Sequence, residues 1–431
     1  MTRTKESGID WIGQIPEEWE VTRIKNIVSI ERGASPRPID KFISDNDTGV
    51  NWIRIGDTYK GNKYITSTRL KITNRGKQFS RYIHPGTLIL SNSMSFGEPY
   101  ISSIYGCIHD GWLSLAPYNN ISKEYLYWLL LSDVCTSQFN LVSIGAVVEN
   151  LSVDKVGNTL VSMPYSLSEQ QKIADFLDKK TAQLDKAKRL LEKQIQKLKD
   201  YRASLIYETV TKGLDKTVPM KDSGIDWIGQ VPEGWGVIKF KYLGDVKQGL
   251  TYSPSDIVDK DEGILVLRSG NIQNGILDFT NNVYVKTKVA ESIVLRKNDI
   301  LITARNGSPV LIGKNAIIDT DIKATFGAFM MVFRANQSLF AKFAFYLMNV
   351  SFNFYRTFFT TSTVNQLTAA IFNGIEVPLP SIYEQKKITD FLDEKTVQID
   401  KLIQIKSQQI NNINKQRQTL IYDYVTGKRR V

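Results

Sequence analysis

The chain has 431 residues, of which 42% are hydrophobic and 23% charged, and it carries a net charge of +11 at pH 7. This length suits two domains with connectors. The apolar stretches are too short, or too interrupted by polar residues, to span a bilayer. The first residues lack the apolar segment of a secretion signal. Only two cysteines occur, Cys107 and Cys135. This number excludes a disulfide framework and argues against a cysteine-based zinc site. We therefore expect inert thiols in a cytoplasmic protein.

The net positive charge bears on the choice of partner. A basic surplus of this size favours a polyanion, usually nucleic acid. Charge that serves only solubility would account for it as well, so the charge alone leaves both interpretations open.

Two short sequences recur along the chain at nearly the same offset. Residues 7–16 read SGIDWIGQIP and residues 223–232 read SGIDWIGQVP, while IADFLD at 173–178 recurs as ITDFLD at 388–393. The offsets of 216 and 215 residues agree, so the whole chain is one unit used twice. Between these echoes the two copies diverge strongly, which indicates one architecture that does one kind of work on two different targets.

The variable regions, 20–165 and 236–380, contain short apolar runs that end in turn residues, such as NWIRIG at 51–56 and ILVLRSG at 264–270. Helical stretches follow in both copies, so each region predicts an α+β domain with polar loops displayed at one edge. Loops on a scaffold usually carry recognition, and side chains that can contact base edges lie in these loops. The candidate DNA-binding residues are Asn92, Ser93, Ser95, Arg305, Asn306, Ser308, Thr363, Asn365 and Gln366. Any one of them could instead be a turn or cap residue.

Each copy ends in a long predicted helix with an apolar residue at every seventh position. A sustained heptad of this kind is typical of a coiled coil. Lys406 interrupts the heptad in the second copy. The predicted seam residues are Leu177, Leu184, Leu191, Leu198 and Leu205 in the first helix, and Leu392, Ile399, Ile413 and Leu420 in the second.

The starts of the two helices carry the same signal. Ser166 precedes Glu169 by three residues and Ser381 precedes Glu384 by three, which is the spacing of a capping box. Because each helix leaves its globular region at one end, a two-fold arrangement predicts that the pair is antiparallel. The alternative is that each helix docks only on its own domain.

These patterns define the expected architecture: an α+β protein with two pseudo-symmetric α/β variable domains, joined by two long helices that pack as an antiparallel coiled coil. We expect the first variable domain at 1–165, the central helix at 166–213, a linker, repeated leader and second variable domain at 214–380, and the C-terminal helix at 381–431. The C-terminal end resembles the start of the connector after Tyr207, and the N-terminus resembles its finish. The chain therefore resembles a circle cut between residues 431 and 1, with its ends close together.

No catalytic or metal-binding motif emerges from the sequence. The only histidines, His84 and His109, lie in the first copy alone, and we expect both to be structural. GSPVLIGK at 307–314 is one residue too long for a phosphate-binding loop, and Asn315 stands where a Ser or Thr would hold Mg²⁺. The charged segment Asp393-Glu394-Lys395 lies on a predicted coiled-coil helix, and we interpret it as surface charge.

The leaders SGIDWIGQIPEEW (7–19) and SGIDWIGQVPEGW (223–235), together with SEQQKIADFLD (168–178) and YEQKKITDFLD (383–393), resemble the specificity subunit of type I restriction–modification enzymes over essentially the full chain. The resemblance implies a non-catalytic subunit in which the two variable domains are target-recognition domains. Each of them reads one half of a bipartite, asymmetric site in double-stranded DNA, while the helix pair sets the spacer. It also implies two docked methyltransferase subunits that use S-adenosylmethionine, and two motor-nuclease (restriction) subunits that use ATP. This chain itself is expected to bind no cofactor and no metal, since S-adenosylmethionine, ATP and Mg belong to the partner subunits.

Two rival functions remain at this point. A catalytic DNA enzyme with its own methyltransferase or nuclease centre conflicts with the missing motifs, and binding of S-adenosylmethionine by the isolated chain would support it. A purely structural coiled-coil adaptor would bind no DNA, whereas a DNA reader loses affinity steeply as the salt concentration rises.

Overall fold

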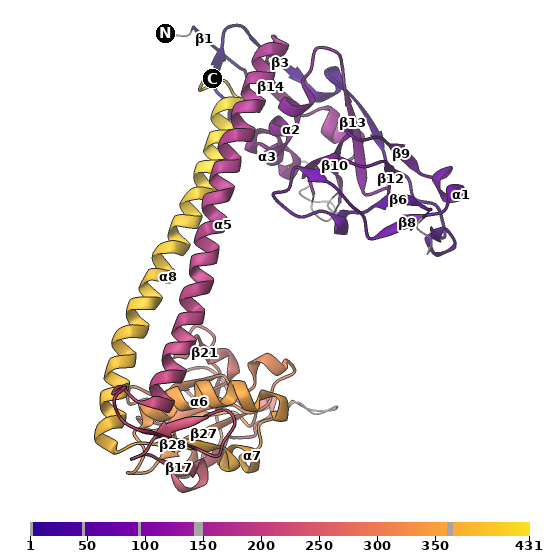
Figure 1. Cartoon of the computed structure of the whole chain (residues 1–431). Helices are drawn as coiled ribbons and strands as arrows, with labels where there is room; N and C mark the ends of the chain where they lie inside the picture. Colours follow the sequence, from indigo (N-terminus) through magenta and orange to yellow (C-terminus); the bar gives the residue numbers. More distant parts are fainter. Residues whose placement is uncertain (1–2, 45–47, 94–95, 142–149, 360–364) are drawn as a thin grey trace. The chain divides into compact units, whose positions relative to one another are not determined.

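The chain folds into two compact units, Met1–Glu192 with Ser407–Val431, and Lys193–Lys406. The structure is a computed structural model and describes residues 3–44, 48–93, 96–141, 150–359 and 365–431 (Figure 1). Each unit therefore combines one variable region with adjoining parts of both long helices. This division differs from a sequential one because the helices pack on both variable regions.

The variable region of the first unit holds two five-stranded sheets, with the orders β4-β13-β10-β11-β7 and β5-β8-β6-β12-β9. Neighbouring strands are antiparallel except for the pairs β6–β12 and β7–β11. The strands of this unit are β1 (Thr4–Glu6), β2 (Gln14–Pro16), β3 (Trp19–Arg23), β4 (Val28–Arg32), β5 (Ile43–Ser44), β6 (Val50–Ile53), β7 (Tyr64–Ile65), β8 (Leu70–Ile72), β9 (Arg81–Ile83), β10 (Leu88–Ser91), β11 (Pro99–Ser102), β12 (Gly106–Ile108), β13 (Trp112–Pro117) and β14 (Leu160–Pro164). Its shorter helices are α1 (Asn74–Lys77), α2 (Lys123–Leu131), α3 (Asp133–Leu141) and α4 (Val153–Gly157).

The second variable region repeats this topology. Its sheets have the orders β18-β27-β24-β25 and β19-β23-β20-β26, which match the first four strands of each sheet in the first unit, including the parallel pair β20–β26. The strands are β15 (Met220–Asp222), β16 (Gln230–Pro232), β17 (Gly236–Lys239), β18 (Gly244–Gln248), β19 (Ile257–Val258), β20 (Ile264–Leu267), β21 (Ile272–Gln273), β22 (Ile276–Leu277), β23 (Tyr284–Val285), β24 (Ile300–Thr303), β25 (Asn315–Ile317), β26 (Ala324–Phe326), β27 (Met330–Ala335) and β28 (Glu376–Leu379). The shorter helices are α6 (Ala341–Tyr355) and α7 (Ala369–Gly374), and the long helices are α5 (Leu167–Lys212) and α8 (Ile382–Val425).

The expected α+β class and the coiled-coil helices are confirmed. In the first unit, the ring of Phe176 lies 4.4 Å from that of Tyr424, and Arg417 pairs with Asp185, which lies further along α5. As α5 advances, its partner in α8 comes from an earlier position, so the helices are antiparallel (Figure 1).

The second unit shows the same orientation. Lys406 Nζ donates to Gln194 Oε1 at 2.7 Å, and Arg202 further along α5 pairs with Asp400, which precedes Lys406 in α8. Lys406, which interrupts the heptad, is only half-exposed, and its ammonium group is hydrogen-bonded to a side chain of the other helix.

The predicted seam residues face inward. Leu177, Leu392 and Ile399 are buried, and the other members of the seam are half-buried: Leu184, Leu191, Leu198, Leu205, Ile413 and Leu420. The alternative arrangement also holds in part, because the helix ends complete the cores of the two units. Ile173 and Val425 belong to the first core, and Val210 and Ile388 to the second.

Each repeated leader is tied to the start of a long helix. Trp19 Nε1 donates to Glu169 Oε1 at 3.2 Å, and Trp235 Nε1 donates to Glu384 Oε2 at 3.0 Å. The serine half of each capping box forms, since the Oγ atoms of the two cap serines accept from the backbone N–H of these glutamates. The glutamate carboxylates, however, are engaged by the leader tryptophans, which explains why leader and helix start recur together.

The ends of the chain lie close together, as the circular pattern predicts. Tyr422 Oη on α8 donates to the carbonyl oxygen of Trp11 in the N-terminal leader at 2.7 Å. Gly427 has a φ of 74° and packs so tightly on Pro16 that an added Cβ would lie 2.5 Å from the ring. Within the described part of the chain, no helix is long and apolar enough to cross a membrane.

Candidate nucleic-acid interface

In each unit, loops from several strands meet at one edge, which we call the loop edge. In the first unit it comprises residues 33–40, 54–57, 92–93 and 109–111, and in the second residues 249–256, 268–271, 304–309 and 327–329. Backbone hydrogen bonds join the loops in both, for example Asn92 N to Gly111 O and Ala304 N to Phe329 O, each at 2.9 Å. Equivalent strands thus deliver equivalent loops to equivalent places.

One glycine at each loop edge is required by this close approach. An added Cβ on Gly33 would lie 2.1 Å from the carbonyl oxygen of His109, and one on Gly249 would lie 2.1 Å from that of Gly327. Gly33 and Gly249 are separated by the same 216 residues as the leaders. The repeat therefore continues through the variable regions, where its sequence signal is reduced to single residues.

An arginine follows the central strand in both units. Arg54 after β6 and Arg268 after β20 each precede a short 3₁₀ helix, η3 (Ile55–Asp57) and η6 (Ser269–Asn271). Their backbone N–H groups donate to Asp57 Oδ2 at 3.0 Å and to Asn271 Oδ1 at 2.9 Å. Both arginines are half-buried, with a fixed backbone and a cationic side chain at the loop edge.

The sequence analysis missed these two arginines. The signal was present, since both stand between an apolar run and a glycine, in WIRIG (52–56) and VLRSG (266–270). Arginine is the side chain best suited to bidentate contacts with guanine or with phosphate. We therefore add Arg54 and Arg268 to the candidate residues.

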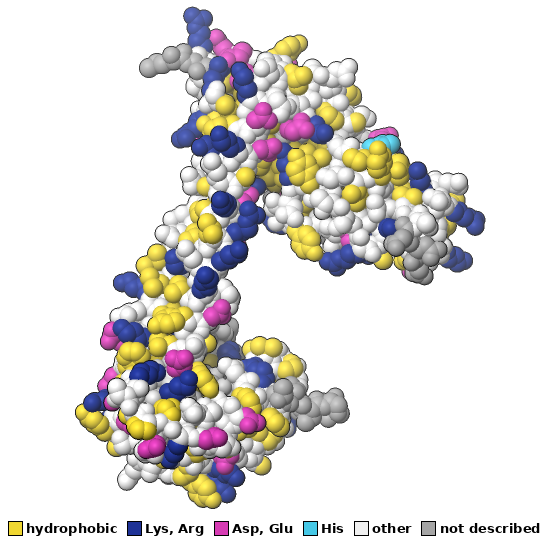
Figure 2. Space-filling model, viewed as in Figure 1, with side chains coloured by type: hydrophobic (Ala, Val, Ile, Leu, Met, Phe, Trp, Pro, Cys, Tyr) yellow, Lys and Arg dark blue, Asp and Glu magenta, His cyan; other side chains and the backbone are white. Residues whose placement is uncertain are grey.

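A cleft of about 1060 Å³ opens at the loop edge of the first unit. Arg37, Arg54 and Arg69 line it together with Trp52, so cationic and aromatic groups face the same space. The side chain of Arg37 is 81% exposed and lies 3.1 Å from the Asp110 carboxylate. Basic side chains also gather on the surface around α1 and β8 (Figure 2). The cleft thus offers cationic side chains for phosphates beside the carboxyl groups of Asp40 and Asp110, while the ring of Trp52 is almost fully buried in its wall.

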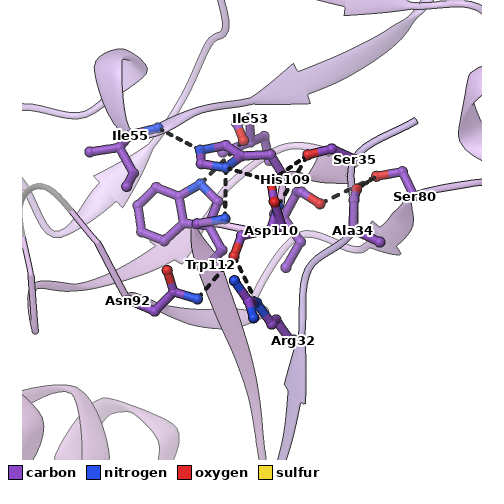
Figure 3. A network of polar contacts seen from close by, with 12 residues as sticks. Arg32, Ala34, Ser35, Ile53, Ile55, Ser80, Asn92, His109, Asp110 and Trp112 are labelled. Carbon is purple, nitrogen blue, oxygen red and sulfur yellow. Dashed lines mark hydrogen bonds and ion pairs between the residues drawn. The ribbon is translucent and has the colours of Figure 1, made fainter. Parts of the chain in front are cut away.

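His109 holds the wall of this cleft together (Figure 3). Its Nδ1 faces the N–H of Gly111 at 2.7 Å, and its Nε2 faces the N–H of Ile55 at 3.3 Å. A neutral imidazole accepts one such hydrogen bond, whereas a protonated ring accepts neither. Burial lowers the pKa of His109, and this effect outweighs the attraction of Asp110. These contacts agree with the structural role expected for this residue.

We expect His109 to make the first unit less stable in acid. Its pKa in the folded protein lies below the value of about 6.5 in an unfolded chain, so the unfolded chain binds the proton first as the pH falls. The stability loss should begin near about pH 6.5 and level off below the lowered folded-state pKa. The unfolding temperature, followed by tryptophan fluorescence from about pH 7.5 to about pH 5, should fall more steeply for the native chain than for His109→Gln.

His84→Gln is the matched control for this experiment, because His84 is exposed. It should retain the native pH dependence. If His109→Gln and the native chain show equal slopes, His109 does not contribute to acid sensitivity.

The structure places the candidates of the first unit differently from the sequence-based expectation. Asn92 is only 1% exposed, and its Nδ2 donates to the carbonyl oxygen of Asp110 at 2.9 Å. The prediction that Asn92 lies on an exposed loop is therefore wrong, because its side-chain amide donates to the backbone of the turn at 109–111. Ser93 is half-buried, and Ser95 lies outside the described residues.

In the second unit, five candidates from distant parts of the chain converge. The backbone of Arg305 pairs with that of Gln366, and Arg305 Nη2 donates to Gln366 Oε1 at 2.7 Å. Asn365 Nδ2 donates to the carbonyl oxygen of Gly307 at 3.3 Å. Asn306 Oδ1 accepts from the N–H of Ser308, which shapes the loop. Thr363 lies outside the described residues.

Arg305 is the most prominent member of this group. It is exposed, and its guanidinium lies 5.9 Å from the ring centre of Phe329, which is itself 62% exposed. An exposed arginine oriented by an amide and an aromatic ring can approach a base edge at small entropic cost.

Neither cysteine offers reactive chemistry. Cys107 and Cys135 are buried, and burial raises the pKa of both thiols. Among the described residues, no group of three or more His, Cys, Asp or Glu side chains could hold a metal ion.

Two copies of one α+β domain, each carried on part of an antiparallel helix pair, define a two-domain recognition protein. The family model described as the type I restriction modification DNA specificity domain matches residues 16–199 and again residues 232–415. The chain belongs to this family, and both copies of the repeat belong to it.

Individual relatives agree with this assignment. The EcoKI specificity subunit of Escherichia coli K12 is 32% identical over 206 residues, covering 46% of this chain and 44% of that protein. The MjaVIII specificity subunit of Methanocaldococcus jannaschii is 24% identical over 429 residues, covering 97% and 94% of the two chains. This chain therefore aligns with less than half of the EcoKI subunit but with nearly all of the MjaVIII subunit.

Solved structures share the fold. A chain from a structural study of the assembly and conformational transition of the type I restriction–modification system superposes with a TM-score of 0.78 at 16% identity, covering 96% of this chain and 99% of that one. The HsdS subunit of Thermoanaerobacter tengcongensis gives a TM-score of 0.53 at 16% identity, covering 96% and 98%.

Proposed function

We propose that this chain is the non-catalytic DNA-specificity subunit of a type I restriction–modification complex, and that each variable domain recognises one half of a bipartite, asymmetric site. The observation that carries the proposal is the pair of loop edges. They share topology and the placement of one arginine, Arg54 or Arg268, yet they differ at most of their other positions. Equivalent positions with different chemistry imply two half-sites of different sequence.

The physical roles of the residues divide accordingly. The net charge of +11 attracts phosphates without reading sequence. The loop-edge side chains read base edges, and each good bidentate pair contributes about 1–3 kcal/mol of discrimination. Because both domains belong to one chain, binding of one half-site raises the effective concentration of the second domain at the other.

The partners follow from the family. We propose that two methyltransferase subunits, which carry S-adenosylmethionine, and two motor-nuclease subunits, which use ATP and Mg, assemble on this chain. The chain itself supplies recognition and spacing, in keeping with the absence of catalytic motifs from its sequence. The antiparallel helices α5 and α8 set the spacer between the half-sites.

The direct test is a genome-wide map of N6-methyladenine in cells that express this chain with its methyltransferase subunit, compared with cells that lack this chain. We expect a new asymmetric motif with two short halves around a fixed unspecified gap. A contiguous motif would contradict the bipartite site. Absence of new methylation from a complex that assembles would favour a structural adaptor instead.

A further inference from the structure

Each variable domain is fastened to the helix pair by the last aspartate of the repeated hexapeptide. In the first unit, Asp178 Oδ1 on α5 accepts from Lys63 Nζ at 2.7 Å and from Trp128 Nε1 on α2 at 2.9 Å. The side chain of Lys63 is 12% exposed and that of Asp178 is 39% exposed, so the ion pair is shielded from water on the lysine side only. The helix and the variable domain therefore share one charge-assisted network.

The second unit builds the equivalent network from different residues. Asp393 on α8 forms an ion pair with Lys342 and accepts from Tyr346 Oη at 2.8 Å, both on α6. Asp393 therefore has a role beyond the predicted surface charge: its side chain is 33% exposed, yet it has partners in the variable domain. The sequence pattern could not reveal this, since the partners lie about fifty residues away on another helix.

An arginine from the opposite long helix adds a second link. In the first unit, Arg417 on α8 lies 5.8 Å from the ring centre of Trp128, and its Nε lies 3.6 Å from Asp185 Oδ1 on α5. Its side chain is 20% exposed. The same tryptophan thus contacts an aspartate from one long helix and an arginine from the other.

The arginine link is repeated in the second unit. Arg202 Nε on α5 lies 3.2 Å from Asp400 Oδ1 on α8, and both residues line one cavity with Tyr346. Arg202 and Asp400 are the repeat equivalents of Arg417 and Asp185, since both pairs are separated by 215 residues. Divergent variable domains therefore meet an unchanged pair of charges on the helices.

This conservation of geometry suits a positioning role better than a stabilising one. Partly exposed ion pairs add little net stability because desolvation offsets their attraction. Ion pairs that flank an apolar seam do, however, favour the register and orientation in which opposite charges on the two helices meet. The networks link that register to the orientation of each variable domain.

We propose that Trp128, Asp178 and Arg417 in the first unit, and Tyr346, Asp393 and Arg202 in the second, are positioning residues that hold each variable domain at a fixed angle on the helix pair and thereby restrict the spacer length that the protein accepts. This inference rests on the proposed function, because a spacer exists only in a bipartite site. None of these six residues lies at a loop edge, so base preference should not depend on them.

The test uses the assembled methyltransferase complex and a panel of duplexes. The duplexes carry the mapped site, the same site with the spacer lengthened or shortened by one base pair, and single base changes in either half. Asp178→Asn combined with Trp128→Phe removes the ion pair and the indole N–H of the first unit. In the second unit, Tyr346→Phe removes the hydroxyl that donates to Asp393, and its combination with Asp393→Asn removes the ion pair as well, with little loss of packing volume.

We expect the preference for the native spacer over its neighbours to fall by about three- to tenfold in the double variants, the range of a lost hydrogen bond to a charged group that is partly solvated. The preference for each base should stay within about twofold of native, since the loop edges are untouched. The controls Asp175→Asn and Tyr201→Phe change exposed residues on α5 and should keep the native spacer preference.

An unchanged spacer preference in all the variants would overturn the inference, as would an equal loss of methylation on every duplex by the mild Tyr346→Phe variant. A different outcome would contradict the proposed function: a native complex that accepts every spacer length equally. A native complex that selects one spacer, together with variants that select it equally well, would disprove the positioning role alone.

Discussion

Adding one heptad to each long helix is expected to lengthen the spacer in the recognised DNA site by about three base pairs while both half-sites stay the same. Seven helical residues add about 10 Å at 1.5 Å per residue, and this length corresponds to about three base pairs at 3.4 Å each when the helices follow the DNA axis. A whole heptad keeps the apolar seam facing the partner helix. The insertions belong after Gln194 in α5 and after Lys406 in α8, which face each other.

The measurement is the methylation motif of cells that carry the lengthened chain. A chain with the heptad in α5 alone is the control, because its added residues have no partner in α8, and its complex should lose the sharply defined spacer. Altered half-sites with an unchanged spacer would show that the helices do not set the distance.

The Arg305→Ala variant is expected to lose discrimination at one base pair of one half-site. Arg305 is exposed and held by Gln366 and Phe329, so truncation removes a fixed cationic donor without opening the core. Loss of a bidentate base contact costs about 1–3 kcal/mol, which corresponds to about 5- to 150-fold in relative affinity for the correct base.

Binding of the assembled complex to a base-substitution panel checks this expectation. Arg296→Ala is the matched control: it removes the same charge from an exposed position that precedes β24, whereas Arg305 follows that strand. The control should weaken binding to every duplex slightly and leave base preference intact. If Arg305→Ala behaves like Arg296→Ala, Arg305 contacts only phosphates or no DNA.

The features that repeat or recur periodically were predictable from the sequence. The heptad of leucines predicts the long helix α5, because a helix places every seventh side chain on one face. The matched leaders predict that the chain ends meet, and the bond from Tyr422 to the N-terminal leader confirms it. The heptad is a local signal, because it depends only on residues within a few helical turns of one another.

Only the tertiary structure decided which residues that are distant in the sequence lie close together in space. Asn92 fits an exposed polar loop by its sequence, but pairing of its loop with the 109–111 turn buries it. Arg54 and Arg268 look unrelated until equivalent parallel strands place both at a loop edge. Asp393 looks like helix surface alone until α6 brings the hydroxyl group of Tyr346 within hydrogen-bond distance of it.

The sequence by itself therefore determined the duplication, the helix pair and the circular connection, since these follow from repetition and periodicity. Only the tertiary structure decided which polar side chains are exposed to a ligand and which hold the scaffold together. The physical reason is that burial and hydrogen bonding of a side chain depend on strand pairings between residues far apart in the chain, and these pairings leave no periodic signal.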